Sequence, residues 1–216
     1  MTDHASPRSA TSAPRERPAS LAAVVRRRVF RMALRPAARQ PYAPLVHLGP
    51  PAGGWTVPDD AIDAAWSCCC VGAGADGPFP RALAARYGAH VRTVVDGERR
   101  SGRGRAPGRN GAPHADVRSL PRLIREPRDG RVDLLALDID GREYDLLPAL
   151  ELVDMGVRVL LVSLHPARGP LVARRLLDDL RRQGYLVVHR AAPARFTLVR
   201  LAELGRRGHG VAAPRL

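Results

Sequence analysis

The chain contains no lysine, so arginine supplies all 35 of its Lys and Arg residues and the formal net charge is +14. Abundant alanine, glycine and proline beside arginine indicate the codon bias of a GC-rich genome, and much of the charge is then compositional. Such a charge still attracts polyanions. Aromatic residues make up only 4%, and no interleaved aromatic platform for stacking bases is present. We expect no specific nucleic-acid binding and keep a basic nucleic-acid-associated protein as a minor alternative.

Cysteine is scarce as well: the three cysteines are consecutive, at positions 68–70. Neighbouring residues of a strand point to opposite faces, so this triplet predicts buried apolar side chains in a reducing compartment rather than a disulfide framework. The roughly 7–15-residue apolar core of a secretory signal is missing, and so is the run of about 18 apolar residues that crosses a membrane. We expect a cytoplasmic protein without a membrane span.

The remaining composition fits one α/β domain with tails. We predict a disordered basic tail over residues 1–45, with a possible short helix at 21–35 that docks on the domain or lies on an anionic membrane surface. The domain is expected over 46–204 and a flexible tail over 205–216. Histidines in the predicted elements lack metal-ligand spacing, so no metal site is expected.

The pattern from Trp66 to Asp96 predicts a strand, a glycine turn, a helix and a second strand. The apolar run Cys68–Val71 is a buried strand, the turn spans Gly72–Gly77, and Gly88 closes the helix. The unit has about 30 residues, the size of one half of a nucleotide-binding domain.

This turn has the chemistry of a nucleotide site. Gly72, Gly74 and Gly77 fit the spacing G-x-G-x-x-G, and glycine lets a backbone come close to a ligand. A helix that begins after the turn aims unpaired N–H groups at that ligand. Asp96, at the end of the second strand, can accept hydrogen bonds from ribose hydroxyls.

Two cofactors, NAD and S-adenosylmethionine, suit this turn, and an α/β turn without a ligand is the remaining alternative. Pro78 and Pro80 stand where a dinucleotide fold continues its helix. Because proline interrupts helices, we expect S-adenosylmethionine rather than NAD.

A second acidic strand end follows the run 132–137, which is apolar except for Asp133; there Asp138 and Asp140 flank Ile139. The run predicts a central parallel strand, and ligands of open α/β sheets bind at the carboxyl ends of such strands. Both aspartates are therefore expected beside the glycine turn. Two alternatives remain: a D-x-D pair that holds a divalent cation, as in glycosyltransferases, and a helix cap at Asp140.

Five segments together resemble the FkbM-type family of S-adenosylmethionine-dependent methyltransferases. They are GGWTVP at 53–58, CCCVGAGAD at 68–76, VDLLALDIDGREYDLL at 132–147, SLH at 163–165 and GYLVVH at 184–189. The resemblance implies a Rossmann-like class I methyltransferase fold, with a mostly parallel sheet and helices on both faces. It also implies O-methylation of a hydroxyl on a sugar or a natural-product-like small molecule.

Carried over by position, the resemblance assigns the site residues. Those implied to contact S-adenosylmethionine are Gly72, Gly74, Asp76, Asp96 and Asp140. The candidates for the base that removes the hydroxyl proton are His165 and Asp138.

Only 36 positions separate Asp96 from Val132, where the complete fold needs a helix, a strand and another helix. We therefore expect the sheet to lack an edge strand, and a partner subunit can supply the missing wall of the acceptor pocket. The alternatives to an enzyme are a catalytically degenerate fold that acts as a binding or scaffold subunit, an NAD-binding protein and a nucleic-acid-associated protein.

Overall fold

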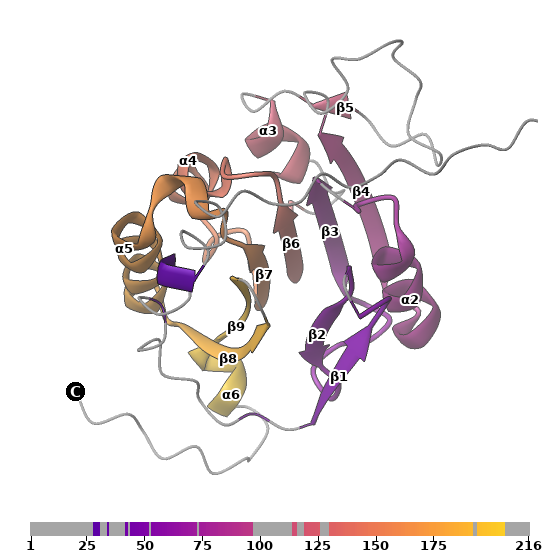
Figure 1. The fold of residues 1–216 in the computed structure, drawn as a ribbon. Coiled ribbons are helices and arrows are strands. Elements are labelled where there is room, and N and C mark those ends of the chain that lie inside the picture. The colour runs from indigo at the N-terminus through magenta and orange to yellow at the C-terminus, as the bar shows by residue number, and fades with distance from the viewer. Residues whose placement is uncertain are drawn as a thin grey trace, which may run out of the picture.

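The computed structural model describes residues 28–30, 34, 42, 44–51, 53–72, 74–96, 114–115, 119–125, 130–191 and 194–205 (Figure 1). Most of the expected N-terminal tail, the C-terminal tail from residue 206 and the arginine-rich stretch 97–113 lie outside these residues.

A mixed, mostly parallel sheet forms the centre of the domain. In spatial order its strands are β5 (His114–Ala115), β4 (His90–Asp96), β3 (Ser67–Gly72), β6 (Leu134–Asp138), β7 (Val159–Ser163), β9 (Arg195–Arg200) and β8 (Tyr185–Ala191). β9 runs antiparallel to both of its neighbours, and the other pairs are parallel. The predicted α/β fold with a mostly parallel sheet is confirmed. The expected loss of an edge strand is not complete: between β4 and α3 the described residues contain only the two-residue β5, which pairs with the end of β4.

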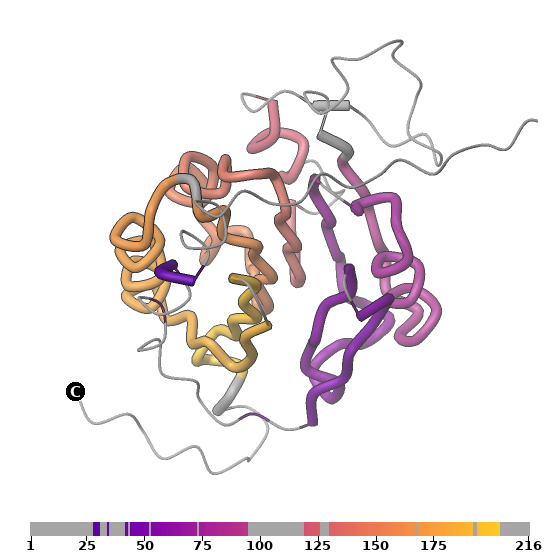
Figure 2. Tube along the Cα trace, in the orientation of Figure 1, coloured from indigo at the N-terminus to yellow at the C-terminus, as the bar shows by residue number. Residues whose placement is uncertain are grey.

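Helices cover both faces of the sheet, as predicted (Figure 1). One face carries α2 (Pro78–Tyr87) and the antiparallel hairpin of β1 (Leu45–Leu48) and β2 (Trp55–Pro58). The other face carries α3 (Leu120–Arg125), α4 (Glu143–Leu146) and α5 (Pro170–Arg182). Short 3₁₀ turns η2 (Leu147–Ala149) and η3 (Pro166–Arg168) and helix α6 (Leu201–Gly205) complete the described elements. Each face of the sheet thus has its own hydrophobic cluster. Figure 2 shows the path of the Cα trace in the same orientation as Figure 1.

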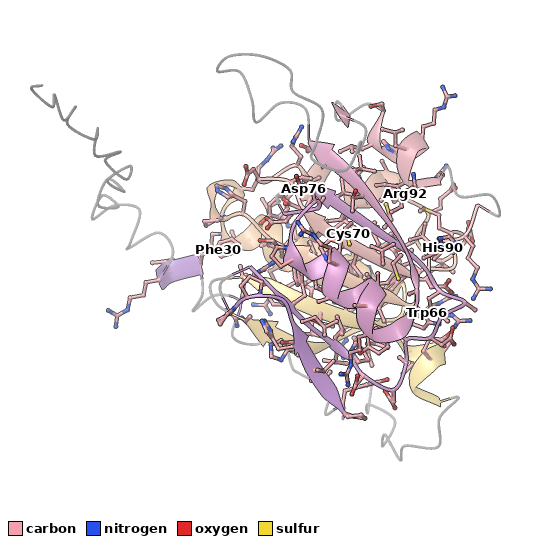
Figure 3. All side chains as sticks on the ribbon, turned by 90° about the vertical axis from the view of Figure 1, so that its right-hand side faces the viewer. Phe30, Trp66, Cys70, Asp76, His90 and Arg92 are labelled. Atoms are coloured by element: carbon pink, nitrogen blue, oxygen red, sulfur yellow. The ribbon has the colours of Figure 1, made fainter. Side chains whose placement is uncertain are left out.

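The cysteine triplet in β3 alternates between these two clusters. Cys68 and Cys70 pack under α2 and the hairpin, and Cys69 packs on the face of α3 and α5. Figure 3 shows Cys70 on the side of the sheet that α2 covers. All three thiols are free and buried, and burial raises the pKa of Cys69 to about 11, so it stays protonated at neutral pH. The predicted buried, apolar cysteines are confirmed.

Part of the N-terminal segment belongs to the core. Residues 28–30 are helical, and Phe30 and Leu34 are almost completely buried in the cluster that α5 covers. Arg190 donates a hydrogen bond to the carbonyl oxygen of Leu34 at 2.9 Å. The described part of the predicted 21–35 helix therefore docks on the domain, and the core begins before residue 46.

None of the helices in the described ranges is long and apolar enough to cross a membrane.

Asp133 joins the amino ends of three central strands. Its side chain is only 6% exposed and accepts hydrogen bonds from the backbone N–H of Ser67 and from Arg131, each at 3.0 Å. Nε of Arg158, just before β7, lies 3.3 Å from the same carboxylate. Because one carboxylate contacts groups from β3, β6 and β7, it fixes the relative positions of these strands.

We expect Asp133→Ala to lower the free energy of unfolding by about 3 kcal/mol, since it leaves a buried backbone donor without its acceptor and removes the buried carboxylate that pairs with Arg131 and Arg158. The matched control is Glu151→Ala. Glu151 pairs with Arg125 at 3.1 Å but its side chain is 69% exposed, and loss of such a pair costs less than about 0.5 kcal/mol. Urea denaturation measures both values. Equal effects of the two variants would contradict the structural role of Asp133.

Candidate functional site

The glycine turn after β3 is closed by its own backbone. Gly72 and Gly74 have positive φ angles of 97° and 77°. The N–H of Ala75 donates to the carbonyl of Gly72 at 3.1 Å, and the N–H of Gly77 donates to that of Gly74 at 2.9 Å. The chain thus reverses at two consecutive turns before α2 begins.

The first two glycines of the turn serve different purposes. A Cβ at Gly72 would lie 2.1 Å from the carbonyl oxygen of Asp138, so glycine is required there for β3 and β6 to approach each other. A Cβ at Gly74 would meet nothing within 4 Å. Gly74 therefore has open space in front of it that a ligand can enter, whereas the main role of Gly72 is to allow packing of the sheet.

α2 runs unbroken from Pro78 to Tyr87, so the expected interruption by Pro78 and Pro80 is wrong. Both prolines fall in the first turn, where N–H groups have no partner inside the helix and proline is tolerated. They also remove N–H groups from that turn, so this helix offers fewer donors to a pyrophosphate. The smaller number of backbone N–H donors at the start of α2 is therefore the remaining reason to expect S-adenosylmethionine rather than NAD. Gly88 ends the helix with φ of 67°, as predicted.

Asp138 lies beside the glycine turn, as predicted. It is the register partner of Gly72 across the β3–β6 pair. Asp138, Gly74 and Ala75 line a small hollow that we call the turn hollow, with Gly53, Trp55 and Phe79 as further walls. The regular spacing of parallel strands brings Asp138 here, while the β1–β2 hairpin supplies Trp55 as a cover. The turn hollow encloses only about 10 Å³, room for about one water molecule.

The other predicted residues are not among those that line this hollow. Asp140 follows β6, is exposed and has φ of 57°. His165 follows β7 and packs beside the same loop, because a Cβ at Gly141 would lie 3.4 Å from the Cβ of His165. Asp76 lies in the turn near the amino end of α2 (Figure 3), and its carbonyl accepts a hydrogen bond from Arg81 at 3.1 Å. β4 ends at Asp96, whose side chain lies outside the described part of the chain.

Glu143 is a site residue that the sequence reasoning missed. It is completely buried, and its two carboxylate oxygens accept hydrogen bonds from the backbone N–H groups of Ile139 and Gly141, each at 2.7 Å. Burial raises its pKa to about 7, although the backbone hydrogen bonds act in the opposite direction. Glu143 therefore holds the loop that carries Asp138 and Asp140. The sequence signal that could have indicated this role is the position of Glu143, an acidic residue in the first turn of a helix that directly follows the loop after β6.

Arg195, at the start of β9, is the second residue that the sequence reasoning missed. Its guanidinium group lies 4.0 Å from the ring centroid of Trp55. Burial lowers its pKa, and the negative charge of Asp138 acts in the opposite direction. Arg195 is brought here by the antiparallel pairing of β7 with β9, in which Ser163 faces Arg195. No local pattern around residue 195 indicates this contact.

The D-x-D alternative gains no further ligand from the fold. No group of three or more His, Cys, Asp or Glu residues gathers as a metal site within the described ranges. No family model, curated protein sequence or solved structure is detectably similar to this chain.

The buried Glu143 predicts a dependence of stability on pH. Its pKa rises from 4.5 to about 7 on folding, so between these values the folded state holds a proton that the unfolded state has lost. The free energy of unfolding should therefore fall by about 3 kcal/mol as pH rises through this window. Urea denaturation at pH 5, 6, 7 and 8 measures the slope. It should largely disappear in Glu143→Gln and persist in the exposed control Glu151→Gln; an unchanged slope in Glu143→Gln would contradict the assignment.

Proposed function

We propose that this chain is an S-adenosylmethionine-dependent methyltransferase that acts on a hydroxyl of a small sugar-like or natural-product-like molecule. The observation that carries the proposal is the open space in front of Gly74, beside Asp138 at the carboxyl end of β6. Open α/β sheets bind ligands at such strand ends, next to a glycine turn.

The strand order supports a Rossmann-like class I methyltransferase fold. When the strands of the sheet are renumbered along the chain so that β3 is strand 1 and β9 is strand 7, their spatial order is 3-2-1-4-5-7-6. The first five positions follow the doubly wound order of nucleotide-binding sheets. The reversed β9, between β7 and β8, adds a seventh strand, and a seven-stranded sheet is what the resemblance to the FkbM-type family implies.

The residues of the glycine turn fit S-adenosylmethionine better than NAD. Gly74 leaves room for close approach, and Pro78 and Pro80 reduce the donors that a pyrophosphate needs. Asp76, Asp96 and Asp140 remain the proposed contacts to the polar groups of the cofactor.

Binding of a nucleoside requires the turn hollow to widen, because it now encloses about 10 Å³. Trp55 in β2 is one of its walls, whereas the backbone of the hairpin is held on β9 by the hydrogen bond of Thr197 to the carbonyl oxygen of Thr56. We infer that cofactor binding displaces the Trp55 side chain from Gly74.

When bound, the cofactor would supply an electrophilic methyl group for transfer to the acceptor oxygen, with the sulfur as the leaving group. The protein aligns the hydroxyl with the methyl group, and alignment alone accounts for roughly 7–11 kcal/mol of a barrier in favourable cases. His165 or Asp138 accepts the hydroxyl proton.

The narrow hollow favours a second candidate, a binding or scaffold subunit that has lost catalysis. In that case the fold retains the glycine turn, but His165 and Asp138 have no catalytic role. Methyl transfer that occurs only when a partner subunit completes the pocket would identify a dormant enzyme, and no transfer with the partner present would identify a scaffold.

The binding prediction uses two glycines with similar backbone strain. Gly74 and Gly130 both have positive φ, and a Cβ at either position would meet nothing within 4 Å, but only Gly74 lines the turn hollow. Calorimetry on the full chain should show S-adenosylhomocysteine binding, weakened at least tenfold by Gly74→Val, about 1.4 kcal/mol. Gly130→Val should bind as the wild type does. Tighter binding of NAD than of S-adenosylhomocysteine would overturn the cofactor assignment.

The catalytic prediction concerns His165. If this histidine accepts the hydroxyl proton, His165→Ala should reduce single-turnover methyl transfer by about 10²–10⁴-fold. Its affinity for S-adenosylhomocysteine should not change, because His165 does not line the turn hollow. The assay uses labelled cofactor and a panel of hydroxylated acceptors. A full rate in His165→Ala together with a large loss in Asp138→Asn would transfer the role of base to Asp138; no transfer by the wild type, with cofactor bound, would support the scaffold.

A further inference from the structure

A second hollow, which also has Trp55 in its lining, lies between the β1–β2 hairpin and the strands β8 and β9. We call it the β9 hollow. It encloses about 90 Å³, and its polar lining consists of His47, Thr56, His189, Arg195 and Thr197. No acidic residue is among the residues that line it. The β9 hollow is thus larger than the turn hollow and has a cationic lining.

Arg195 gives this hollow its charge. The guanidinium stacks on Trp55 at 4.0 Å from the ring centroid, and the partly buried position disfavours the charged form. A cation in such an environment interacts more strongly with an anion than a solvated one does, because water screens the pair less. The planar guanidinium also matches the geometry of carboxylate and phosphate oxygens.

The other polar groups are held in place by the hairpin. Nε2 of His47 lies 3.3 Å from the carbonyl oxygen of Pro50. A carbonyl can only accept, so this nitrogen carries the proton. Nδ1 of His47 lies 3.2 Å from the hydroxyl of Thr56. The hydroxyl of Thr197, which is almost completely buried, donates to the carbonyl of Thr56 at 2.6 Å. Hydrogen bonds therefore position His47, Thr56 and Thr197, three of the polar residues that line the hollow.

We propose that the β9 hollow binds a carboxylate or phosphate group, with Arg195 as its main contact. Trp55 and Arg195 also link this hollow to the methyl-transfer site: Trp55 lines both hollows, and the charge of Asp138 acts on Arg195. Resting on the proposed function, the inference specifies the acceptor as a small molecule with an anionic group a few bonds from the hydroxyl that is methylated, such as a hydroxy acid, a sugar acid or a sugar phosphate.

The first test measures anion binding without any methyl transfer. Inorganic phosphate and acetate are titrated into the full chain and followed by calorimetry, at constant ionic strength with chloride as the competing anion. We expect binding that Arg195→Met weakens at least tenfold. The matched control is Arg190→Met, since Arg190 also stacks on an aromatic ring, that of Phe196 at 5.5 Å, but does not line the hollow. Circular dichroism confirms that each variant is folded.

A second variant keeps the test decisive if Arg195→Met fails to fold. Ala191 is exposed and lines the hollow, so Ala191→Glu brings a carboxylate to the anion site and should abolish phosphate binding. Ala191→Gln, of the same size without the charge, should retain most of it. Absence of phosphate and acetate binding to the wild type, or binding that neither Arg195→Met nor Ala191→Glu weakens, would overturn the proposal.

The final arm separates this proposal from the proposed function. Hydroxy acids and sugar phosphates are compared with their neutral amides or dephosphorylated forms as acceptors, and S-adenosylhomocysteine binding is measured on the same protein. Preference for the anionic acceptors, lost in Arg195→Met, identifies the acceptor as the source of the anion. Anion binding without cofactor binding would retain the anion site and reject the methyltransferase. Cofactor binding with transfer to neutral acceptors only would reject the acceptor assignment.

Discussion

The close approach of Gly72 to Asp138 is the contact on which the site depends. A side chain at position 72 would overlap the carbonyl oxygen of Asp138, 2.1 Å from the position of its Cβ, so only glycine lets β3 and β6 pair up to their carboxyl ends. The pairing carries the glycine turn and the loop after β6 to the same edge of the sheet. Glu143 then fixes that loop through two backbone hydrogen bonds. The sheet and the candidate site are therefore determined by the same local geometry.

The β1–β2 hairpin controls access to that edge. Asp59, just after β2, accepts hydrogen bonds from Arg86 and Tyr87 at the end of α2, at 2.7–2.8 Å. The hydrogen bonds to Arg86 and Tyr87 lower the pKa of Asp59. These contacts hold one end of the hairpin on α2, while the hydrogen bond of Thr197 to Thr56 holds its middle on β9. Trp55, next to Thr56, lines both hollows, so movement of this one side chain affects both.

Several arginines have structural roles, which bears on the meaning of the high positive charge. Arg92 donates to the carbonyl oxygens of Leu123 and Ile124 at the end of α3, where a cation also interacts favourably with the helix dipole. Arg158 contacts Asp133 and lies over the ring of Trp66. Such contacts explain part of the arginine content by the needs of the fold. Weak, salt-sensitive attraction of polyanions by the rest of the charge stays a prediction.

The sequence by itself determined the elements whose pattern is local. The apolar run Cys68–Val71, the glycine turn and the cap at Gly88 predicted β3, the turn and the end of α2, because a run of apolar residues and the backbone freedom of glycine are local features of the chain. It also placed Asp138 beside the turn, since carboxyl ends of parallel strands share one edge. The predicted interruption of the helix by Pro78 and Pro80 was wrong, because whether a proline breaks a helix depends on which turn of the helix it occupies.

Only the tertiary structure decided which distant groups meet. The edge strand β5 consists of two residues whose pairing with β4 no local pattern reveals. Burial of Phe30, the stacking of Arg195 on Trp55 and the enclosure of Glu143 likewise depend on elements that are far apart in the chain. A side chain's burial, its charge partners and therefore its pKa are properties of the packed fold, and the residues that distinguish this site from a simple glycine turn are the ones that packing brought together.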